Sequence, residues 1–371
     1  MALARVLIAY ESEAAARDRL AEFGYATDIA AEIAVYLAQA TDLVGLFDEL
    51  RAALAAEGLA VDFVEIDDLI GRVAQVEDRQ STLLWCQTDG LRYYRGSAVA
   101  SLARLAGIAR YGSPPFAQHL CQDKFGSACL AQSAGLPIVP TLLLEGSQTV
   151  ASLGEADWDG PLFVKPATLG AKIGIFADSR CRGLEEAGLR ALRLWERYGD
   201  RALVQPYIAG DDVRVSFMNT GSAFVAQLGI FRLTKDERSE TGGDFMTMKD
   251  NETLSGAKDT GGARGAFGEE RVAAFVPQMV DLRAENHPAV AVITQAAMRL
   301  ARLLRLDDYF SMDFRLDNEG VPHFLEFEVC PAVTIYDFAE YLRSTHGLGL
   351  GAALARSFRL AHARRFDRNE A

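Results

Sequence analysis

The chain has 371 residues, of which 50% are hydrophobic and 24% charged, a composition typical of globular proteins. Because this length exceeds what one simple core organises, two or three lobes of roughly 100–150 residues are expected. The formal net charge of −13 repels phosphate backbones and anionic lipids, which argues against nucleic-acid and membrane partners. Five scattered cysteines without metal-ligand spacing, and no leader-like segment, predict a soluble cytoplasmic protein.

The first third of the chain alternates strands and helices. We expect buried strands at 6–9, 61–66 and 82–87, and helices at 28–40, from 41 or 42 to 57, and at 98–106. This alternation predicts a parallel sheet covered by helices. The breaker Gly112-Ser-Pro-Pro115 ends the segment, and the predicted first lobe covers residues 1–120.

Two further lobes are predicted at 121–210 and 211–371. The middle lobe should contain helices at 122–134 and 185–198 and strands at 141–144, 161–165 and 202–208. The last should contain strands at 213–218, 223–230, 310–316 and 323–329, and helices at 289–304 and near the end of the chain. A polar, glycine-rich stretch at 235–268 has a length that is usually functional or disordered in a compact domain.

The two strands near the end of the chain carry the sharpest pattern. Alternation divides the first of them between a core face and an opposite face: Phe310, Met312, Phe314 and Leu316 on one, and Ser311, Asp313 and Arg315 on the other. In the second, the core face holds Leu325, Phe327 and Val329, and the opposite face holds Glu326 and Glu328. A two-residue turn at Glu319-Gly320 would set Asp313 opposite Glu326.

Three carboxylates, Asp313, Glu326 and Glu328, should therefore share one face. Like charges on neighbouring strands are destabilising, and a divalent cation would relieve the repulsion. Oxygen ligands suit Mg²⁺, which commonly bridges carboxylates to substrate phosphates. The alternative is a solvated polar face on which Arg315 balances the charges, and the pattern alone does not decide between the two.

Two lysines occupy places where a cation could contact a phosphate. Lys165 ends a predicted strand and precedes a loop with Gly170 and Gly174, whose backbone N–H groups could join the lysine in holding a polyphosphate. The loop matches neither the P-loop order nor GxGxxG, so an ordinary connection is the alternative. Lys124 begins a helix, where the helix dipole disfavours a cation; a surface lysine is the alternative there.

The order of these motifs resembles the ATP-grasp superfamily, and within it the D-alanine–D-alanine ligase branch. The matching segments are Gln122-Asp-Lys124, Lys165-Pro with Gly170 and Gly174, Leu203-Val-Gln-Pro-Tyr-Ile-Ala-Gly-Asp-Asp212, Ser311-Met-Asp313 and Leu325-Glu-Phe-Glu-Val-Cys-Pro331. The resemblance covers about residues 105–360. It implies a three-lobed ATP-grasp fold, of α/β and α+β class, with a Rossmann-like parallel sheet in the N-terminal lobe.

The resemblance also implies roles for individual residues. ATP binding would fall to Lys124, Lys165, Lys172, Gln205, Ile208 and Asp212. Mg²⁺, which Mn²⁺ could replace, would be held by Asp313, Glu326 and Glu328. The stretch 235–268 would form a lid that brings Lys249 to the γ-phosphate of ATP.

The chain departs from the family pattern at the groups that handle the acyl substrate. Ser311 replaces the arginine that steadies the tetrahedral oxyanion, so Arg315 is expected to substitute for it, with Arg232 and Arg214 as other candidates. The segment Tyr10-Glu-Ser-Glu13 lacks the family's glycine-rich N-terminal motif, and Ala171 replaces a serine that helps to bind the first D-alanine. The D-alanine pocket is therefore not expected here.

The function that the resemblance implies is ATP-dependent carboxylate–amine ligation of small substrates, either amino acids or a specialised-metabolite acid. An acyl phosphate would be the intermediate, and ADP and phosphate the products. One alternative, suggested by Asp212-Val-Arg214, is a ligase for a protein or carrier-protein tail. Another, suggested by Ser311 and Gln205, is a nucleotide-binding protein that has lost ligation, although the retained carboxylates and Lys165 argue against it. The sequence leaves the oligomeric state open, with a homodimer as one option.

Overall fold

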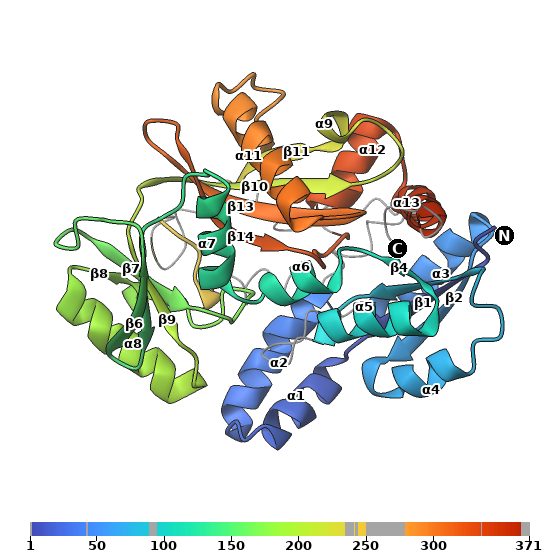
Figure 1. The fold of residues 1–371 in the computed structure, drawn as a ribbon, viewed down its shortest axis with the longest axis horizontal. Helices are drawn as coiled ribbons and strands as arrows, with labels where there is room; N and C mark the ends of the chain where they lie inside the picture. The colour runs from blue at the N-terminus through green and yellow to red at the C-terminus, as the bar shows by residue number, and fades with distance from the viewer. Residues whose placement is uncertain are drawn as a thin grey trace.

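The structure, a computed structural model, contains three sheets that follow one another along the chain (Figure 1). It describes residues 2–41, 44–88, 95–233, 241, 244–249, 279–334 and 336–364. Within these ranges, no helix has the length and apolar character needed to cross a bilayer. The order of one parallel and two antiparallel sheets agrees with the predicted mixed fold class.

The first sheet is parallel, with strand order β2-β1-β3-β4. Its strands are β1 (Arg5–Tyr10), β2 (Ala60–Glu65), β3 (Thr82–Cys86) and β4 (Ala109–Tyr111). The helices of this part are α1 (Glu13–Glu22), α2 (Thr27–Thr41), η1 (Val44–Leu46), α3 (Phe47–Ala56), η2 (Ile66–Asp68), α4 (Leu69–Ala74), α5 (Arg95–Ala106) and α6 (Pro115–Leu120). The sequence predicted the parallel sheet but missed the strand β4 and the helices α1, α4 and α6, which are short and carry no long apolar repeat.

Both faces of the first sheet are covered, which explains the continuous apolar run in β1. Val6 and Ile8 face one cluster and Leu7 the other, and all three side chains are fully buried. The C-terminal helix α13 (Leu350–Arg364) covers one of these faces, where the ring of Phe358 lies 4.6 Å from that of Tyr111. Residues from the two ends of the chain therefore share one core.

The second sheet is antiparallel, with strand order β6-β5-β9-β7-β8. Its strands are β5 (Thr141–Glu145), β6 (Gln148–Leu153), β7 (Leu162–Pro166), β8 (Arg180–Cys181) and β9 (Ala202–Pro206), and the helices around it are α7 (Lys124–Ser133), η3 (Ala177–Ser179) and α8 (Leu184–Tyr198). The amphipathic helix α8 covers the sheet with Ala187, Ala191 and Leu194. Helices α1 and α2 contribute to the same apolar cluster, so the N-terminal helices bridge two lobes.

The third sheet is antiparallel, with strand order β12-β11-β10-β13-β14. Its strands are β10 (Gly210–Met218), β11 (Gly229–Leu233), β12 (Met279–Asp281), β13 (Tyr309–Asp317) and β14 (Pro322–Glu328), and its helices are α9 (Phe224–Gln227), α11 (Ala289–Leu304), η5 (Tyr336–Glu340) and α12 (Tyr341–His346). Helix α11 packs on one face (Figure 1), where Ile293 and Leu300 join Phe310 and Phe314 in the core. The strand predicted at 223–230 is wrong in part, because 224–227 form α9 and the strand begins at Gly229.

Candidate active site

The face of the third sheet that α11 does not cover carries the predicted carboxylates on neighbouring strands. In the register of the sheet, Arg214 on β10 lies opposite Asp313 on β13, and Asp313 lies opposite Glu326 on β14. Ser311 lies opposite Glu328. The predicted pairing of Asp313 with Glu326 is therefore confirmed, and its physical reason is burial of the phenylalanines on the other face.

The hairpin reaches this register by a different route from the one predicted. The Asp317 N–H donates to the carbonyl oxygen of Val321 at 3.1 Å, so residues 318–320 form the loop in place of a two-residue turn. A bulge at the level of Asp313 and Phe314 takes up the extra residue and restores the Asp313–Glu326 pair. Leu325 is displaced by the bulge and only half-buried, whereas Phe324 is 1% exposed and occupies the core in its place. The assignment of Leu325 to the core was wrong.

Arg214 lies among three carboxylates. Its Nε atom donates to Asp337 at 2.9 Å, its Nη2 atom to Glu328 at 2.5 Å, and its Nη1 atom to Asp313 at 3.4 Å. Burial opposes the charge of Arg214, but these carboxylates outweigh it and raise its pKa well above the ordinary value. The guanidinium therefore stays charged and its position is fixed by three elements of the fold.

Two lysines of the second lobe face the carboxylates of the third sheet. The Nζ atom of Lys124, at the start of α7, lies 3.4 Å from Glu326 and donates to the carbonyl oxygen of Leu169 at 2.7 Å. Asp123 caps the same helix by accepting from the Gly126 N–H, which offsets the unfavourable position of a lysine at a helix start. Lys165, at the end of β7, is 7% exposed.

Charge pairing explains the protonation states of this group. Burial lowers the pKa of Lys165, an effect that Glu326 opposes. Burial disfavours the ionised form of Glu326, yet Lys124 and Lys165 outweigh it, so the pKa of Glu326 is lowered. Lysines of one lobe and a carboxylate of another thus stabilise each other's charges across the junction.

The glycine-bearing loop after β7 is held in a set shape and places Lys172 beside the same carboxylates. Asp200 accepts from the backbone N–H groups of Thr168 and Leu169 at 2.9 and 3.3 Å. Ala171 and Lys172 both adopt left-handed backbone conformations, with φ of 50° and 63°, which non-glycine residues rarely do. The Lys172 cation acts electrostatically on Asp313 and Glu326, so the loop brings it toward the third sheet.

The donor set fits a divalent cation, although the carboxylates are not arranged around one point. Burial raises the pKa of Asp313 to about 7; Arg214 opposes this rise, and Glu326 and Glu328 add to it. In the ranges that the structure describes, no three His, Cys, Asp or Glu side chains form a ready metal cage. Glu328 turns to Arg214 and Glu326 to Lys124, so each carboxylate is held by a cation of the protein. Mg²⁺ binds oxygen ligands, and its positive charge would reduce the repulsion between these neighbouring carboxylates.

Arg315 lies on the same face of β13 as Asp313, but its hydrogen bonds go to a separate network with the predicted adenine and ribose residues. Its Nη1 atom lies 2.7 Å from Asp212, and its Nε atom donates to the carbonyl oxygen of Ile208 at 3.0 Å. Its Nη2 atom donates to Tyr207 and to the carbonyl oxygen of Asp244. With 6% of its surface exposed, Arg315 uses four of its five N–H donors in these bonds. The structure therefore does not support the expectation that Arg315 replaces the missing oxyanion arginine.

Arg232 is also excluded from the carboxylate face. It lies opposite Val213, a core-facing residue, in the pairing of β11 with β10, so it projects from the other face of the sheet. Its guanidinium pairs with Glu285 at 3.3 Å. The expectation that Arg232 could contact the oxyanion is therefore corrected by the register of β11.

The remaining predicted ATP and lid residues lie around the second lobe. Gln205 is buried on β9 and donates to the Thr141 hydroxyl at 2.8 Å. Most of the predicted lid, 235–268, falls outside the described residues, apart from Thr241 and 244–249. Residues 244–249 rest on the second lobe: the Met248 N–H donates to Ile175, and the Tyr207 hydroxyl donates to Asp244. Lys249 is exposed at the end of this short stretch.

Two buried carboxylates that pair with arginines, Asp337 and Glu11, were not predicted from the sequence. Asp337, the buried partner of Arg214, follows the last strand and had no motif to mark it. At the carboxyl end of β1, Glu11 is 4% exposed and receives hydrogen bonds from Arg19 and Arg95. A charged residue directly after a buried strand was the available signal, because ligand sites of α/β sheets lie at that edge.

Comparison with known proteins gives relatives that include several D-alanine ligases, while no protein-family model matches the chain. D-alanine–D-alanine ligase A from Pseudomonas putida is 25% identical over 243 residues, which cover 66% of this chain and 61% of the relative. D-alanine–D-alanine ligase from Nitrosospira multiformis is 24% identical over 271 residues, covering 73% and 77%. A putative D-alanine–D-lactate ligase from Streptomyces coelicolor is 27% identical over 272 residues, covering 71% and 68%.

Solved structures agree in fold over the whole chain. The D-alanine–D-alanine ligase from Bacillus anthracis complexed with ATP superposes with a TM-score of 0.63 at 15% identity, covering all of both chains. The VanG D-Ala:D-Ser ligase from Enterococcus faecalis gives a TM-score of 0.60 at 14% identity, covering 97% of this chain and 99% of the other. These likenesses show the fold.

The chain therefore has the three-sheet fold of these ATP-grasp ligases and resembles them in sequence. Among these ligases, its sequence is similar to the D-alanine–D-alanine ligase branch, the resemblance that the order of its motifs predicted.

Proposed function

We propose that the protein is an ATP-dependent carboxylate–amine ligase that joins small substrates and releases ADP and phosphate. One observation carries this proposal: Lys124 and Lys165 of the second lobe face Glu326 and Asp313 of the third sheet. A nucleoside triphosphate bound between the two lobes would have its phosphates contacted by the lysines and its divalent cation held by the carboxylates.

The phosphate groups of ATP would be held by Lys124, Lys165 and Lys172. Asp313, Glu326 and Glu328 would hold Mg²⁺, or Mn²⁺ in its place, which when bound neutralises phosphate oxygens. On the nucleoside side, Asp212 would accept from the ribose hydroxyls and Gln205 and Ile208 would contact adenine. Arg315 would act there as a positioning residue, because it ties Ile208 and Asp212 together.

The reaction would proceed in two displacements. A carboxylate oxygen of the first substrate attacks the γ-phosphorus of ATP, forming an acyl phosphate and releasing ADP. The amine of the second substrate then attacks the acyl carbon, loses a proton, and displaces phosphate through a tetrahedral intermediate. Lysines that neutralise phosphoryl oxygens, and exclusion of water from the acyl phosphate, are the catalytic means available here.

Arg214 is the residue that we assign to the tetrahedral oxyanion, in place of Arg315 and Arg232. Arg214 lies on β10, the strand next to Ser311 and Asp313 of β13. It therefore supplies a guanidinium group on the sheet face where Ser311 stands in place of the family's arginine. Its contact with Asp313 is long, at 3.4 Å, and an arginine has five N–H donors, so donors remain for a substrate oxygen.

The identity of the acceptor is the finer part of the proposal. The relatives are named for amide-forming and for ester-forming ligases, so the nucleophile could be an amine or a hydroxyl group. We propose an amine, and amino acids or a specialised-metabolite acid as the carboxylate. A protein or carrier-protein tail is the second candidate, favoured by Arg214 in the segment Asp212-Val-Arg214.

The test is an assay of ADP and phosphate release with ATP and Mg²⁺ over a panel of amino acids, hydroxy acids and other small acids, singly and in pairs. We expect ADP only with particular acids or acid–amine pairs, and a condensed product by mass spectrometry. Asp313→Asn and Glu326→Gln should abolish turnover, while the matched variant Glu285→Gln, which touches only the Arg232 pair, should retain it. AMP in place of ADP would contradict the proposal.

A further inference from the structure

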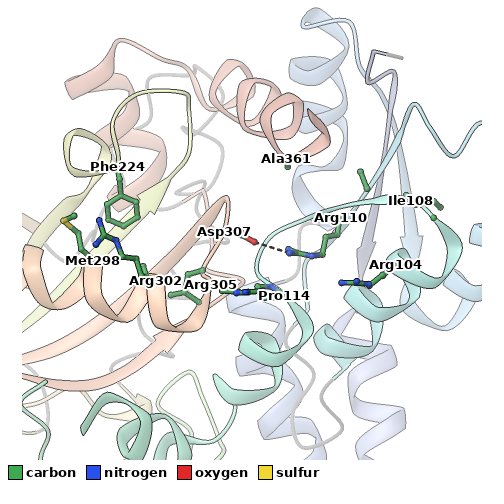
Figure 2. Close-up of a pocket in the computed structure, with 14 residues that line it drawn as sticks. Arg104, Ile108, Arg110, Pro114, Phe224, Met298, Arg302, Arg305, Asp307 and Ala361 are labelled. Carbon is green, nitrogen blue, oxygen red and sulfur yellow. Dashed lines mark hydrogen bonds and ion pairs between the residues drawn. The ribbon is translucent and has the colours of Figure 1, made fainter. Parts of the chain in front are cut away.

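A cavity lined by arginines lies where the first lobe meets the end of α11, on the side of the third sheet opposite the carboxylate face. Its volume is about 720 Å³. Arg104 and Arg110 enter it from α5 and β4 of the first lobe, and Arg302 and Arg305 from the end of α11 (Figure 2). The proposed function makes no use of this cavity.

Three of these arginines have no counter-ion in the described part of the protein. The side chains of Arg104, Arg302 and Arg305 make neither an ion pair nor a hydrogen bond with any described residue. Arg110 alone is paired, with Asp307 at 3.1 Å. Among the described lining residues, one carboxylate therefore accompanies four guanidinium groups, in a protein whose net charge is −13.

Helix dipoles account for only part of this arrangement. Arg104 and Arg302 stand in the last turns of α5 and α11, where a cation is favourable. Arg305 lies beyond the end of α11, at a position with φ of 51°, where glycine would meet less steric resistance. Arg305 is thus a third cation of this cavity without a partner among the described residues, and neutralisation of a helix dipole does not explain its place there.

The lining also offers apolar surface. Ile108, Phe224 and Leu306 lie among the arginines, so a bound molecule would meet both charge and apolar area. The volume falls in the range of small-molecule sites, and guanidinium groups match the geometry of phosphate oxygens. A cavity of this size, lined from two lobes, suits a small molecule better than a protein or nucleic-acid surface.

We propose that this cavity binds a small polyanion bearing phosphate groups and that the bound molecule links the first lobe to α11. Two arginines from each side would contact it, so its binding should stabilise the junction. Because ATP also carries phosphates, the probe must be separated from the proposed nucleotide site. The proposal is independent of the ligase assignment and survives if that assignment fails.

The experiment uses inorganic tripolyphosphate without ATP or Mg²⁺, at low salt, with calorimetric titration and thermal unfolding. Lys165→Met removes a phosphate ligand of the proposed ATP site, and tripolyphosphate should still bind to this variant and raise its melting temperature. Adding Arg104→Gln or Arg305→Gln should weaken binding about tenfold each, the cost of one charge-assisted contact. Both side chains are exposed, so the variants should fold.

Arg182→Gln is the matched control, because it removes one exposed arginine from the second lobe and leaves the cavity unchanged. The proposal is overturned if Arg104→Gln and Arg305→Gln weaken tripolyphosphate binding no more than Arg182→Gln does. It is also overturned if tripolyphosphate does not bind at all. If Lys165→Met does not fold, Arg104→Gln, Arg305→Gln and Arg182→Gln are each made in the wild-type chain. Tripolyphosphate binding at the nucleotide site is then the same in all three variants, so a difference between them reports the cavity.

Discussion

Arg214 donates its Nε hydrogen bond to Asp337 at 2.9 Å, and the Asp337 side chain is completely buried. The same carboxylate accepts from the Ser216 hydroxyl. Because an unpaired buried carboxylate is costly, this pair fixes the guanidinium while its other two nitrogens face Glu328 and Asp313. A helix near the end of the chain thereby positions a side chain of β10 at the candidate active site.

Arg214→Lys should reduce the rate of ligation by about 100- to 1,000-fold, the typical loss when one oxyanion donor is removed. ATP affinity should change little, because Arg214 faces the carboxylates and not the nucleoside residues. Single-turnover product formation and calorimetric ATP binding would separate the two effects. Ligation at the wild-type rate would remove Arg214 from its assigned role.

The Asp337 contact can be tested separately. Asp337→Asn keeps an acceptor for Arg214 and Ser216 but lowers the charge, so it should impair ligation less than Arg214→Lys does. A larger loss for Asp337→Asn, with unchanged thermal stability, would show that Asp337 has a more direct part than positioning.

Arg315→Ala should raise the KM for ATP and leave the kcat of ligation nearly unchanged. The substitution removes the bonds that tie Ile208 and Asp212 to one another, while the carboxylate cluster stays intact. Steady-state kinetics over a range of ATP concentrations would measure both constants. Arg232→Ala is the control, since its partner Glu285 lies away from the site. A fall in kcat at constant KM would instead return Arg315 to the oxyanion.

Gly210→Ala should destabilise the fold by about 2–4 kcal/mol, because the position combines steric overlap with an unusual backbone conformation. At φ of 152°, an added Cβ would lie 1.9 Å from the carbonyl oxygen of Leu316, so β10 and β13 would have to separate. Gly320→Ala is the matched control: φ is 81° there, but no atom lies within 4 Å of the added Cβ. Urea unfolding of both variants checks the difference, and equal losses would contradict the overlap.

Stability should fall in acid partly because of Asp317 at the tip of the hairpin. Burial opposes its charge, but the contact with His323 and the N–H groups of Val321 and Glu319 lower its pKa. A lowered pKa in the folded state adds stability above the pKa of the unfolded chain, and this stability is lost as the pH falls through the folded value. Denaturant unfolding between pH 7 and pH 3 should therefore show a smaller loss for Asp317→Asn than for the wild type. Parallel losses would exclude Asp317 as a contributor.

The local patterns of the sequence determined much of the fold. Continuous apolar runs such as 6–9 predicted buried parallel strands, and alternation in 310–316 predicted which face of β13 enters the core. The same alternation predicted the pairing of Asp313 with Glu326, because a shift of the strand register by one residue would have exposed the phenylalanines. The order of the motifs along the chain predicted the resemblance to D-alanine–D-alanine ligases, to which the chain is similar in sequence and in fold.

Only the tertiary structure decided which cation belongs to which carboxylate. Arg315 and Arg214 both face the same side of the third sheet, yet Asp212 engages the first, and Asp337 engages the second from 123 residues away. The bulge at Leu325 and the packing of α13 on the first sheet likewise depend on partners remote in sequence. Periodicity reports the face on which a side chain lies, whereas the partner it meets there depends on loops and distant elements that periodicity does not encode.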